Sequence, residues 1–345
     1  MSDELLTSLL RDVSRSFYLT MRMLPRPVRR QISLAYLLAR TTDTIADTEV
    51  ADVPSRLLAL AALRERIRGR DNAPLPLAQL RGSDRLPAER VLLDRCEESL
   101  RLLLDLDEAD RRLVREVLDI IISGQELDLK RFGAASADHI VALQTGEELD
   151  DYTYRVAGCV GEFWTKICAA HLWPGTGLES ESLTRQGVRF GKGLQLVNIL
   201  RDLPQDLRKG RCYVPAQILM TAALAPKDLL SAQNQGRFRP AYDELLALAE
   251  GHLAAGWEYT RSLPKRQVRL RLACAWPVLI GARTLRKLRQ ENMLDATRRV
   301  KVSRPEVRSM ILRSVYLYPF ARAWEAQFGK EIELISWPVC SNNKA

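Results

Sequence analysis

The stretch GLQLVNILRDLPQDLRKGRCYVP, residues 193–215, decides how the rest of the chain is interpreted. It begins as an apolar helical pattern and ends in an aspartate pair, Asp202 and Asp206. A second pair with the same spacing, Asp43 and Asp47, closes the helical pattern LAYLLARTTDTIAD. Residues four apart share one face of an α-helix, so each pair places two carboxylates side by side. Two pairs facing each other across a helical cavity would make a cage for Mg²⁺, a hard ion that shares oxygen ligands with phosphate.

The composition indicates helices throughout the chain. Hydrophobic residues make up 46% of the 345 residues, and Leu, Ala, Arg and Glu dominate. Apolar residues recur at three- and four-residue steps, with no convincing run of strict alternation. No linker divides the chain, because residues 68–90 are expected to be a surface connection between helices. We therefore expect one all-α domain that covers residues 1–345.

The same periodicity places the helices. They are predicted at residues 4–22, 28–48, 53–68, 87–104, 108–130, 138–171, 181–203, 213–222, 239–263, 266–293 and 304–328. Pro204 lacks the N–H that would bond the carbonyl of Leu200, so the helix should kink or end there. The second aspartate of that pair should then follow a different backbone course from the first. Gly158 and Gly161 interrupt another long apolar helix, which fits either close helix packing or room for a bulky ligand.

Charge and cysteine usage exclude several classes of function. The formal charge is +9, but the basic residues are spread along helices and form no aromatic–basic motif. This argues against a nucleic-acid partner and fits diphosphate substrates or an anionic membrane surface. The six cysteines form no CxxC pair and predict reduced, buried thiols of a cytoplasmic protein. With only three histidines, neither a histidine zinc site nor a Ser–His–Asp triad is expected.

The chain shows no sign of a membrane span. The first residues, MSDELLTSLLRDVSRSF, carry acids and lack the continuous apolar core of a signal peptide. The longest apolar run, residues 272–282, is about half of what a span requires. We therefore expect nothing in this sequence to cross a bilayer.

Arginines and amides flank both aspartate pairs. Arg40 lies three residues before the first pair, and Arg201 immediately precedes the second. Gln195 and Asn198 share the helical face of the second pair, where amides make poor core residues unless they bind something. The segment SRSF, residues 14–17, adds two hydroxyl groups and a guanidinium. Either pair alone would be an ordinary solvated helix face, but carboxylates, guanidiniums and amides together describe a Mg²⁺–diphosphate site.

At these residues the chain resembles the squalene/phytoene synthases, which are head-to-head trans-prenyltransferases. The resemblance spans roughly residues 10–310 and rests on SRSF, YLLARTTDTIAD, YTYRVAGCVG and the stretch at residues 193–215, in the family's order and spacing. It implies a single isoprenoid synthase domain whose helices surround a central cavity.

The resemblance also implies roles for individual residues. For the Mg²⁺–diphosphate ligands it implies Asp43, Asp47, Asp202, Asp206 and, as a helper, Asn198. For contacts to the diphosphate substrate it implies Ser14, Arg15, Ser16, Tyr36, Arg40, Gln195, Asn198 and Arg201. Tyr152 matches the tyrosine that the family places beside the reacting carbons, where it would assist a proton transfer or stabilise a cation. Val156, Ala157 and Val160 would form apolar walls that exclude water.

The activity implied is that of a squalene synthase. Two farnesyl diphosphate molecules would be condensed with Mg²⁺ to presqualene diphosphate, which NADPH would then reduce to squalene. The segment TRRVKVSRPEV resembles the basic flap of squalene synthases, so Lys301 and Arg304 are expected to bind NADPH. Ser303 stands where an arginine is expected, and no Rossmann glycine motif is present.

Several alternatives stay open on the sequence. Within the family, the chain could stop at presqualene diphosphate, or form dehydrosqualene or phytoene without reduction. A remoter alternative is a non-catalytic helical scaffold. Squalene-type members often carry an extra carboxylate inside each aspartate motif, at positions that are Ala46 and Gln205 here. We expect a peripheral protein that touches the membrane transiently to unload a water-insoluble product, and the number of copies in the assembly is left open.

Overall fold

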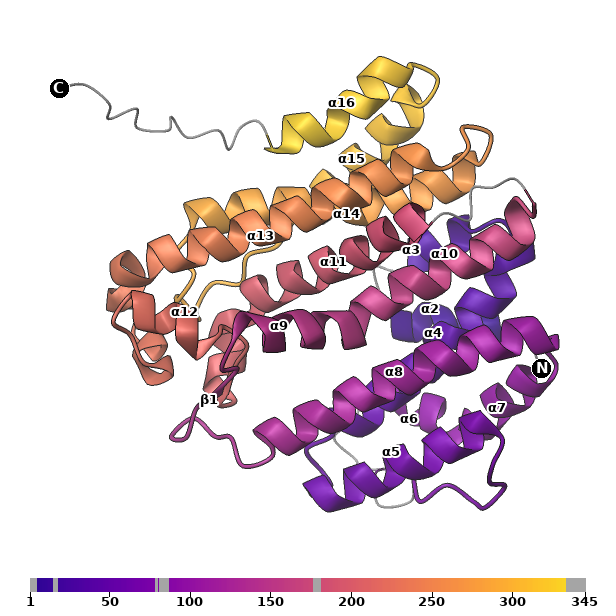
Figure 1. Ribbon diagram of the computed structural model, residues 1–345, viewed down its shortest axis with the longest axis horizontal. Coiled ribbons are helices and arrows are strands. Elements are labelled where there is room, and N and C mark those ends of the chain that lie inside the picture. The colour runs from indigo at the N-terminus through magenta and orange to yellow at the C-terminus, as the bar shows by residue number, and fades with distance from the viewer. Residues whose placement is uncertain (1–4, 15–17, 78–79, 81–86, 176–180, 333–345) are drawn as a thin grey trace.

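The computed structural model describes residues 5–14, 18–77, 80, 87–175 and 181–332, and almost all of its elements are helices (Figure 1). The first part of the chain forms η1 (Leu5–Leu9), α2 (Leu10–Ser14), α3 (Tyr18–Met23), α4 (Arg26–Ala46), α5 (Val53–Arg68), α6 (Pro87–Asp94), α7 (Cys96–Leu104) and α8 (Glu108–Phe132). The middle part forms β1 (Val141–Ala142), α9 (Gly146–Thr153), η4 (Tyr154–Gly158), α10 (Cys159–Leu172), α11 (Glu181–Arg208) and β2 (Arg211–Cys212). The last part forms α12 (Ala216–Thr221), η5 (Pro226–Leu230), η6 (Ala232–Asn234), α13 (Gln235–Ser262), α14 (Val268–Gln290), α15 (Arg304–Leu317) and α16 (Ala321–Ile332).

The predicted all-α class is confirmed, and the errors lie at helix ends and in predicted helices that the structure divides, among them those at residues 87–104 and 304–328. The helix predicted at residues 53–68 coincides with α5, whereas the one predicted at residues 4–22 is divided among η1, α2 and α3. The helix predicted over residues 138–171 begins too early, because β1 pairs in parallel with β2. Val141 pairs with Arg211, and Thr145 then caps the start of α9 by accepting the N–H of Glu148. This short pairing places the chain that follows α11 beside α9.

Two hydrophobic clusters form the core. One packs α4, α5, α7, α8 and α10 together, and the other packs α11, α13 and α14. Figure 1 shows α5, α7 and α8 on one side of the molecule, α13 and α14 on the other, and α10 and α11 between them. The five cysteines of the described residues are unpaired and buried, as predicted. Within the same ranges, no helix combines the length and apolar composition that crossing a bilayer requires.

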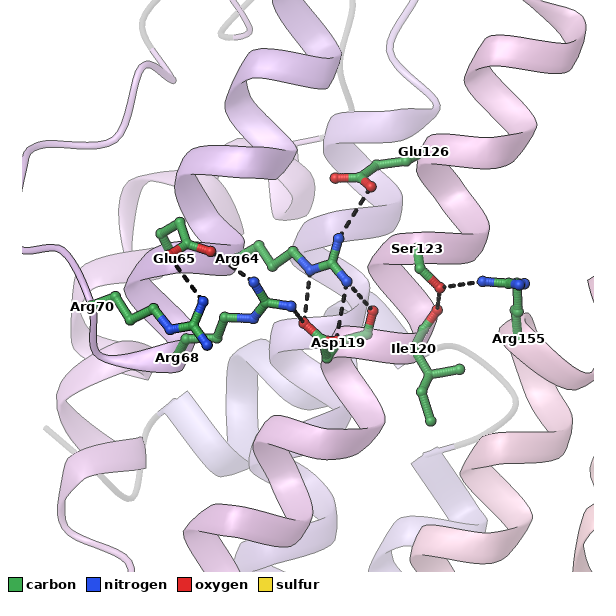
Figure 2. Close-up of polar contacts among 9 residues, drawn as sticks. All are labelled: Arg64, Glu65, Arg68, Arg70, Asp119, Ile120, Ser123, Glu126 and Arg155. Carbon is green, nitrogen blue, oxygen red and sulfur yellow. Dashed lines mark hydrogen bonds and ion pairs between the residues drawn. The ribbon is translucent and has the colours of Figure 1, made fainter.

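The long helix α8 is held in place by charged side chains on two sides (Figure 2). Arg64 of α5 donates to both oxygens of the Asp119 carboxylate at 2.7 and 3.1 Å, and to Glu126 at 3.2 Å. On another side of α8, the Ser123 hydroxyl accepts a hydrogen bond from Arg155 of η4 at 2.9 Å. A planar guanidinium that bonds two carboxylates constrains both the position and the rotation of the helix that carries them. The orientation of α8 is therefore fixed relative to α5 and η4.

The helix predicted to kink or end at Pro204 does not end there. The helix continues to Arg208 with Pro204 inside it. The missing N–H of the proline leaves the carbonyl of Leu200 without its helical partner. In the structure the hydroxyl of Tyr242, from α13, donates to that carbonyl at 3.0 Å. A side chain distant in sequence thus replaces the lost hydrogen bond, and both aspartates of the second pair remain on one helix.

We expect Tyr242→Phe to lower the free energy of unfolding by about 2 kcal/mol, because it leaves the buried Leu200 carbonyl without a donor. Urea unfolding followed by circular dichroism measures the change. Tyr316→Phe is the matched control, since this tyrosine is 74% exposed and its loss of a hydroxyl should be nearly neutral. Equal stability of the two variants would contradict a supporting role for the Tyr242 hydroxyl.

Candidate active site

The two predicted aspartate pairs lie at the C-terminal ends of α4 and α11. Asp43 lies in the last turn of α4, and Asp47 is the residue that follows the helix. The N–H of Asp47 donates to the carbonyl of Asp43 at 2.8 Å, which keeps the pair close to helical geometry. Asp202 and Asp206 lie in the last two turns of α11.

Helix α8 supplies two residues that connect the pairs. The amide of Gln125 donates to the Asp43 carboxylate at 2.6 Å. Asp128, almost one turn further along α8, interacts electrostatically with Asp47 of the first pair and Asp206 of the second. Neither α8 residue was among the predicted site residues. The only signal for them was the sequence QELD on one face of a predicted helix, which is common on solvated helices.

Burial and mutual repulsion disfavour ionisation of three of these carboxyl groups. Burial raises the pKa of Asp206 to about 7, with a further rise from the charge of Asp202. Burial also raises the pKa of Asp128 to about 6. For Asp43 burial and the charge of Asp47 raise the pKa to about 6, but 46% of this side chain is exposed and water weakens the effect. Carboxylates crowded in this way are stabilised when a cation lies between them.

Asp202 differs from these three because two arginines hold its carboxylate. Arg201 donates to it at 2.9 and 2.5 Å, and Arg299 donates to it at 3.1 and 2.8 Å. Burial alone would raise the pKa of Asp202, but these hydrogen bonds outweigh burial and lower it. Arg299 comes from the segment between α14 and α15 and was not among the predicted site residues, although it lies in the basic segment that includes Lys301.

Tyr152 lies beside the acidic residues at the end of α9. Its ring stacks on that of Tyr213, with centroids 4.7 Å apart. The Tyr213 hydroxyl lies 3.2 and 3.1 Å from the two oxygens of the Asp128 carboxylate, and Arg211 lies 3.7 Å from the same group. Burial and the charge of Asp128 raise the pKa of Tyr152 well above its usual range, so its phenol stays neutral. The β1–β2 pairing holds Arg211 and thereby places Tyr213.

The remaining residues predicted near the first pair lie in different surroundings. Ser14 is buried, and its hydroxyl has no hydrogen-bond partner within the described part of the chain. Arg15 and Ser16 lie outside the described residues. Tyr36 is half-buried against the first hydrophobic cluster. Arg40 bonds Glu89 of α6 at 2.8 Å and lies 3.9 Å from Asp43.

The residues predicted around the second pair are only partly brought together. On α11, Gln195 is half-buried and Asn198 is exposed, on the helical face that leads to the aspartates. Lys301 and Arg304 are both exposed. Within the described part of this basic segment, Arg299 bonds an aspartate of the pairs, whereas Lys301 and Arg304 do not.

An apolar cavity of about 150 Å³ lies where the two hydrophobic clusters meet. The predicted wall residues Val156, Ala157 and Val160 line it, together with Trp164 and Phe190. Val156 follows Tyr152 by four residues, so the cavity wall begins one helical turn from the acidic residues. A long apolar group attached to a charged head would fit this arrangement.

The donor set fits a hard divalent cation. Besides the carboxylates, the buried amide oxygens of Gln125 and Gln205 have no hydrogen-bond partner among the described residues. Oxygen ligands of this kind, carboxylate and amide together, are those that Mg²⁺ takes in proteins. Gln205 is one of the two positions at which the resemblance leads one to expect an extra carboxylate, and its amide oxygen is available there as a neutral oxygen donor.

A separate group, Asp107, Asp110 and His171, brings three possible ligand atoms within 4.8 Å of one another. Asp107 caps α8 by accepting the N–H of Asp110 at 2.9 Å. The Asp110 carboxylate accepts a hydrogen bond from Gln31 at 2.7 Å and lies 2.7 Å from His171. These partners are already matched, so the group holds the start of α8 against α4 and α10.

The comparison with known families agrees with this geometry. The model of the squalene/phytoene synthase family matches residues 10–306. The chain belongs to the squalene/phytoene synthase family. A presqualene diphosphate synthase from Zymomonas mobilis subsp. mobilis is 31% identical over 252 residues, which cover 73% of each chain.

Other relatives of this synthase chain are longer or more distant. A bifunctional lycopene cyclase/phytoene synthase from Pyrenophora tritici-repentis is 29% identical over 244 residues, which cover 69% of this chain and 38% of that protein. The chain therefore spans about two fifths of the length of such relatives. The crystal structure of squalene synthase HpnC from Alicyclobacillus acidocaldarius superposes with a TM-score of 0.61 at 21% identity, covering 84% of this chain and 94% of that one. The fold is thus the all-α isoprenoid synthase fold that the resemblance implied.

We expect Mg²⁺ to raise the melting temperature of this synthase chain more at pH 8 than at pH 5. Folding raises the pKa of Asp206 to about 7 and of Asp128 to about 6. Without metal, stability therefore falls as the pH rises from about 4 through 7, because the folded state holds these protons more tightly than the unfolded state. Mg²⁺ binds the ionised carboxylates and offsets that loss.

Differential scanning fluorimetry across this pH range, with and without Mg²⁺, measures the effect. Asp206→Asn should reduce both the pH dependence and the shift caused by Mg²⁺. Asp105→Asn should change neither, because this carboxylate is 63% exposed and lies at the end of α7. A Mg²⁺ shift that is the same at every pH, or that survives Asp206→Asn unchanged, would contradict the assignment.

Proposed function

We propose that this chain joins two molecules of farnesyl diphosphate head to head to give presqualene diphosphate, with Mg²⁺ as its metal. The observation that carries the proposal is the meeting of the two aspartate pairs around Asp128, next to an apolar cavity. Departure of a diphosphate group requires a cationic, oxygen-rich site, whereas the allylic cation left behind requires apolar walls that exclude water. The two requirements are met side by side.

Each aspartate pair would hold metal through its own carboxylates. Bound Mg²⁺ supplies Lewis-acid stabilisation of the charge that develops on the leaving diphosphate. Arg201 and Arg299 already converge on Asp202 with four hydrogen bonds, so both guanidinium groups point at the edge of the second pair. We infer that they donate to diphosphate oxygens there, because a planar guanidinium bonds phosphate in two-point fashion. Arg40 would do the same beside the first pair.

The condensation needs no added oxidant or reductant. The C1–O bond of one farnesyl diphosphate breaks, and the electron pair leaves with the diphosphate. The C2–C3 double bond of the second molecule attacks that C1, and loss of a proton from the same carbon closes the cyclopropane ring. We propose that Tyr152 acts here as a neutral phenol, because its raised pKa disfavours the phenolate. Its ring can face the cation, while Tyr213 and Asp128 hold its orientation.

The cavity wall gives the farnesyl chains their place. A cavity of about 150 Å³ is smaller than the 300–1,000 Å³ of typical ligand sites, so its side chains must move apart when a prenyl chain enters. The large aromatic side chains on this wall are Trp164, Phe190 and Tyr259. Tyr259 is buried and hydrogen-bonded to Thr165, so we expect the partly exposed Trp164 and Phe190 to move. The glycines on the wall, Gly161, Gly187 and Gly191, lie where two helix backbones are in contact, so the backbone there cannot move apart in this way.

A second candidate is the further reduction of presqualene diphosphate to squalene by NADPH. It is favoured by the exposed side chains of Lys301 and Arg304, which belong to the same segment as Arg299 and lie a few residues from it. These two cationic side chains form no ion pair with a residue that the structure describes, and they would suit the phosphates of a nicotinamide cofactor. Ser303 supplies no charge where an arginine is expected, so this binding would depend on Lys301 and Arg304.

Purified protein incubated with farnesyl diphosphate and Mg²⁺ should produce presqualene diphosphate, identified by mass spectrometry. With NADPH added, squalene should appear if the second candidate holds. Dehydrosqualene formed both with and without NADPH would show that presqualene diphosphate loses a proton instead of being reduced, which would contradict the second candidate. Turnover of geranylgeranyl diphosphate instead of farnesyl diphosphate would point to phytoene and overturn the substrate assignment.

We expect Asp43→Asn and Asp202→Asn each to lower turnover at least about a hundredfold. Each substitution replaces a negatively charged ligand with a neutral amide, which binds Mg²⁺ more weakly. Asp105→Asn is the matched control on the exposed surface and should retain normal turnover. Circular dichroism of all three variants checks that the helices persist. Near-normal turnover in either site variant would rule out the metal role of that aspartate pair.

A further inference from the structure

Helix α15 and the turn that follows it carry an apolar stripe that faces solvent. Its members are Leu312, Val315, Tyr316 and Phe320, which are 70%, 48%, 74% and 58% exposed. The rings of Tyr316 and Phe320 are neighbours, with centroids 6.4 Å apart. Residues three and four apart share one side of a helix, so Leu312, Val315 and Tyr316 lie together, and the ring contact with Tyr316 adds Phe320 to form one α15 stripe. Single exposed apolar residues are common on proteins, but four within nine positions require an explanation.

The other side of α15 is firmly attached to the protein. Ser314 is fully buried and its hydroxyl accepts a hydrogen bond from Trp276 of α14 at 2.8 Å. At its start, Ser303 and Glu306 form a capping box. Glu306 also bonds Lys287 of α14 at 2.8 Å. The α15 stripe is therefore displayed on an anchored helix, and the one acid of that helix is used on the inner side.

Arginines accompany the stripe. Arg308 and Arg313 line a shallow groove together with Leu312 and Tyr316. Both arginines are exposed, and neither forms an ion pair with any residue that the structure describes. The surface around the stripe thus combines apolar side chains with positive charge that no carboxylate of the described residues neutralises.

We propose that the α15 stripe docks onto the surface of an anionic lipid bilayer. Amphipathic helices that lie in the membrane interface combine Leu and aromatic residues with flanking Arg or Lys in this way. Anionic headgroups would neutralise Arg308 and Arg313, while the apolar side chains enter the headgroup boundary. A second copy of this chain fits less well, because a symmetric contact would bring the same arginines against each other.

The docking itself does not rest on the proposed function, although the reason for it does. If the chain makes squalene or presqualene diphosphate, its product is a water-insoluble hydrocarbon or an amphiphile with long apolar chains, and either favours a lipid phase. Because no helix in the described residues can cross a bilayer, contact through a surface is the way in which this part of the chain can reach one. An assay without substrate keeps the two questions apart.

The test mixes purified protein with vesicles and measures the bound fraction by sedimentation. The vesicles contain phosphatidylcholine alone, or phosphatidylcholine with about one third phosphatidylglycerol. We expect binding to the anionic vesicles that weakens with added salt, and little binding to the neutral ones. Leu312→Ser with Tyr316→Ser, and separately Arg308→Gln with Arg313→Gln, should each raise the lipid concentration for half-maximal binding about tenfold or more.

Matched controls lie elsewhere on the surface. Leu58 and Leu104 are 63% and 57% exposed on α5 and α7, so Leu58→Ser with Leu104→Ser should bind vesicles like the unchanged protein. Melting temperatures confirm that every variant is folded. Failure of the unchanged protein to bind, or equal binding to neutral and anionic vesicles, would overturn the proposal. A dimer in analytical ultracentrifugation that the stripe variants abolish, without vesicle binding, would make the stripe an interface between copies instead.

Discussion

The close approach of α10 and η4 to α11 is the constraint on which the site depends. A Cβ atom added to Gly161 would lie 1.9 Å from the carbonyl oxygen of Gly187, and one added to Gly191 would lie 2.1 Å from that of Ala157. Only glycine permits backbones to pack this closely. The contact brings η4, next to Tyr152, against the helix that carries the second aspartate pair. Close packing, one of the two explanations offered for Gly158 and Gly161, is confirmed at Gly161. Gly161, Gly187 and Gly191 also line the cavity.

Sequence rules for helix formation fail where a residue distant in the sequence changes the hydrogen bonding of a helix. Pro204 predicts the end of a helix because it lacks an N–H, and that rule is sound for an isolated segment. Here the buried hydroxyl of Tyr242 supplies the missing donor to Leu200. No residue near Pro204 in the sequence indicates that Tyr242 would supply this hydrogen bond. In the same way, the predicted helix over residues 138–171 fails at β1 because the parallel partner of this strand, β2, lies about seventy residues further along the chain.

The site shows the same division between what motifs predict and what packing adds. The aspartate pairs were predictable because two carboxylates repeat at helical spacing beside arginines and amides. Asp128 and Arg299 were not, since each is a single charged residue whose partners come from distant parts of the chain. Asp128 lies in the site because of the position of α8, which Arg64 and Arg155 hold between α5 and η4. Packing decides whether a single charged residue lies in the site, and the spacing of residues along the sequence does not reveal that packing.

The charges around the two pairs are unequal, and the inequality has a physical consequence. Asp202 is satisfied by two arginines, whereas Arg40 lies 3.9 Å from Asp43 and bonds Glu89 more closely. Unneutralised negative charge therefore concentrates around Asp43, Asp128 and Asp206, whose pKa values are raised. A cation entering the site would relieve repulsion there, and it would compete with arginines most at Asp202, because Arg40 and Arg211 lie no closer than 3.9 and 3.7 Å to Asp43 and Asp128. A metal ion would thus be drawn first to the region between the pairs, and the guanidinium groups at the edge of the second pair would remain available to an anion.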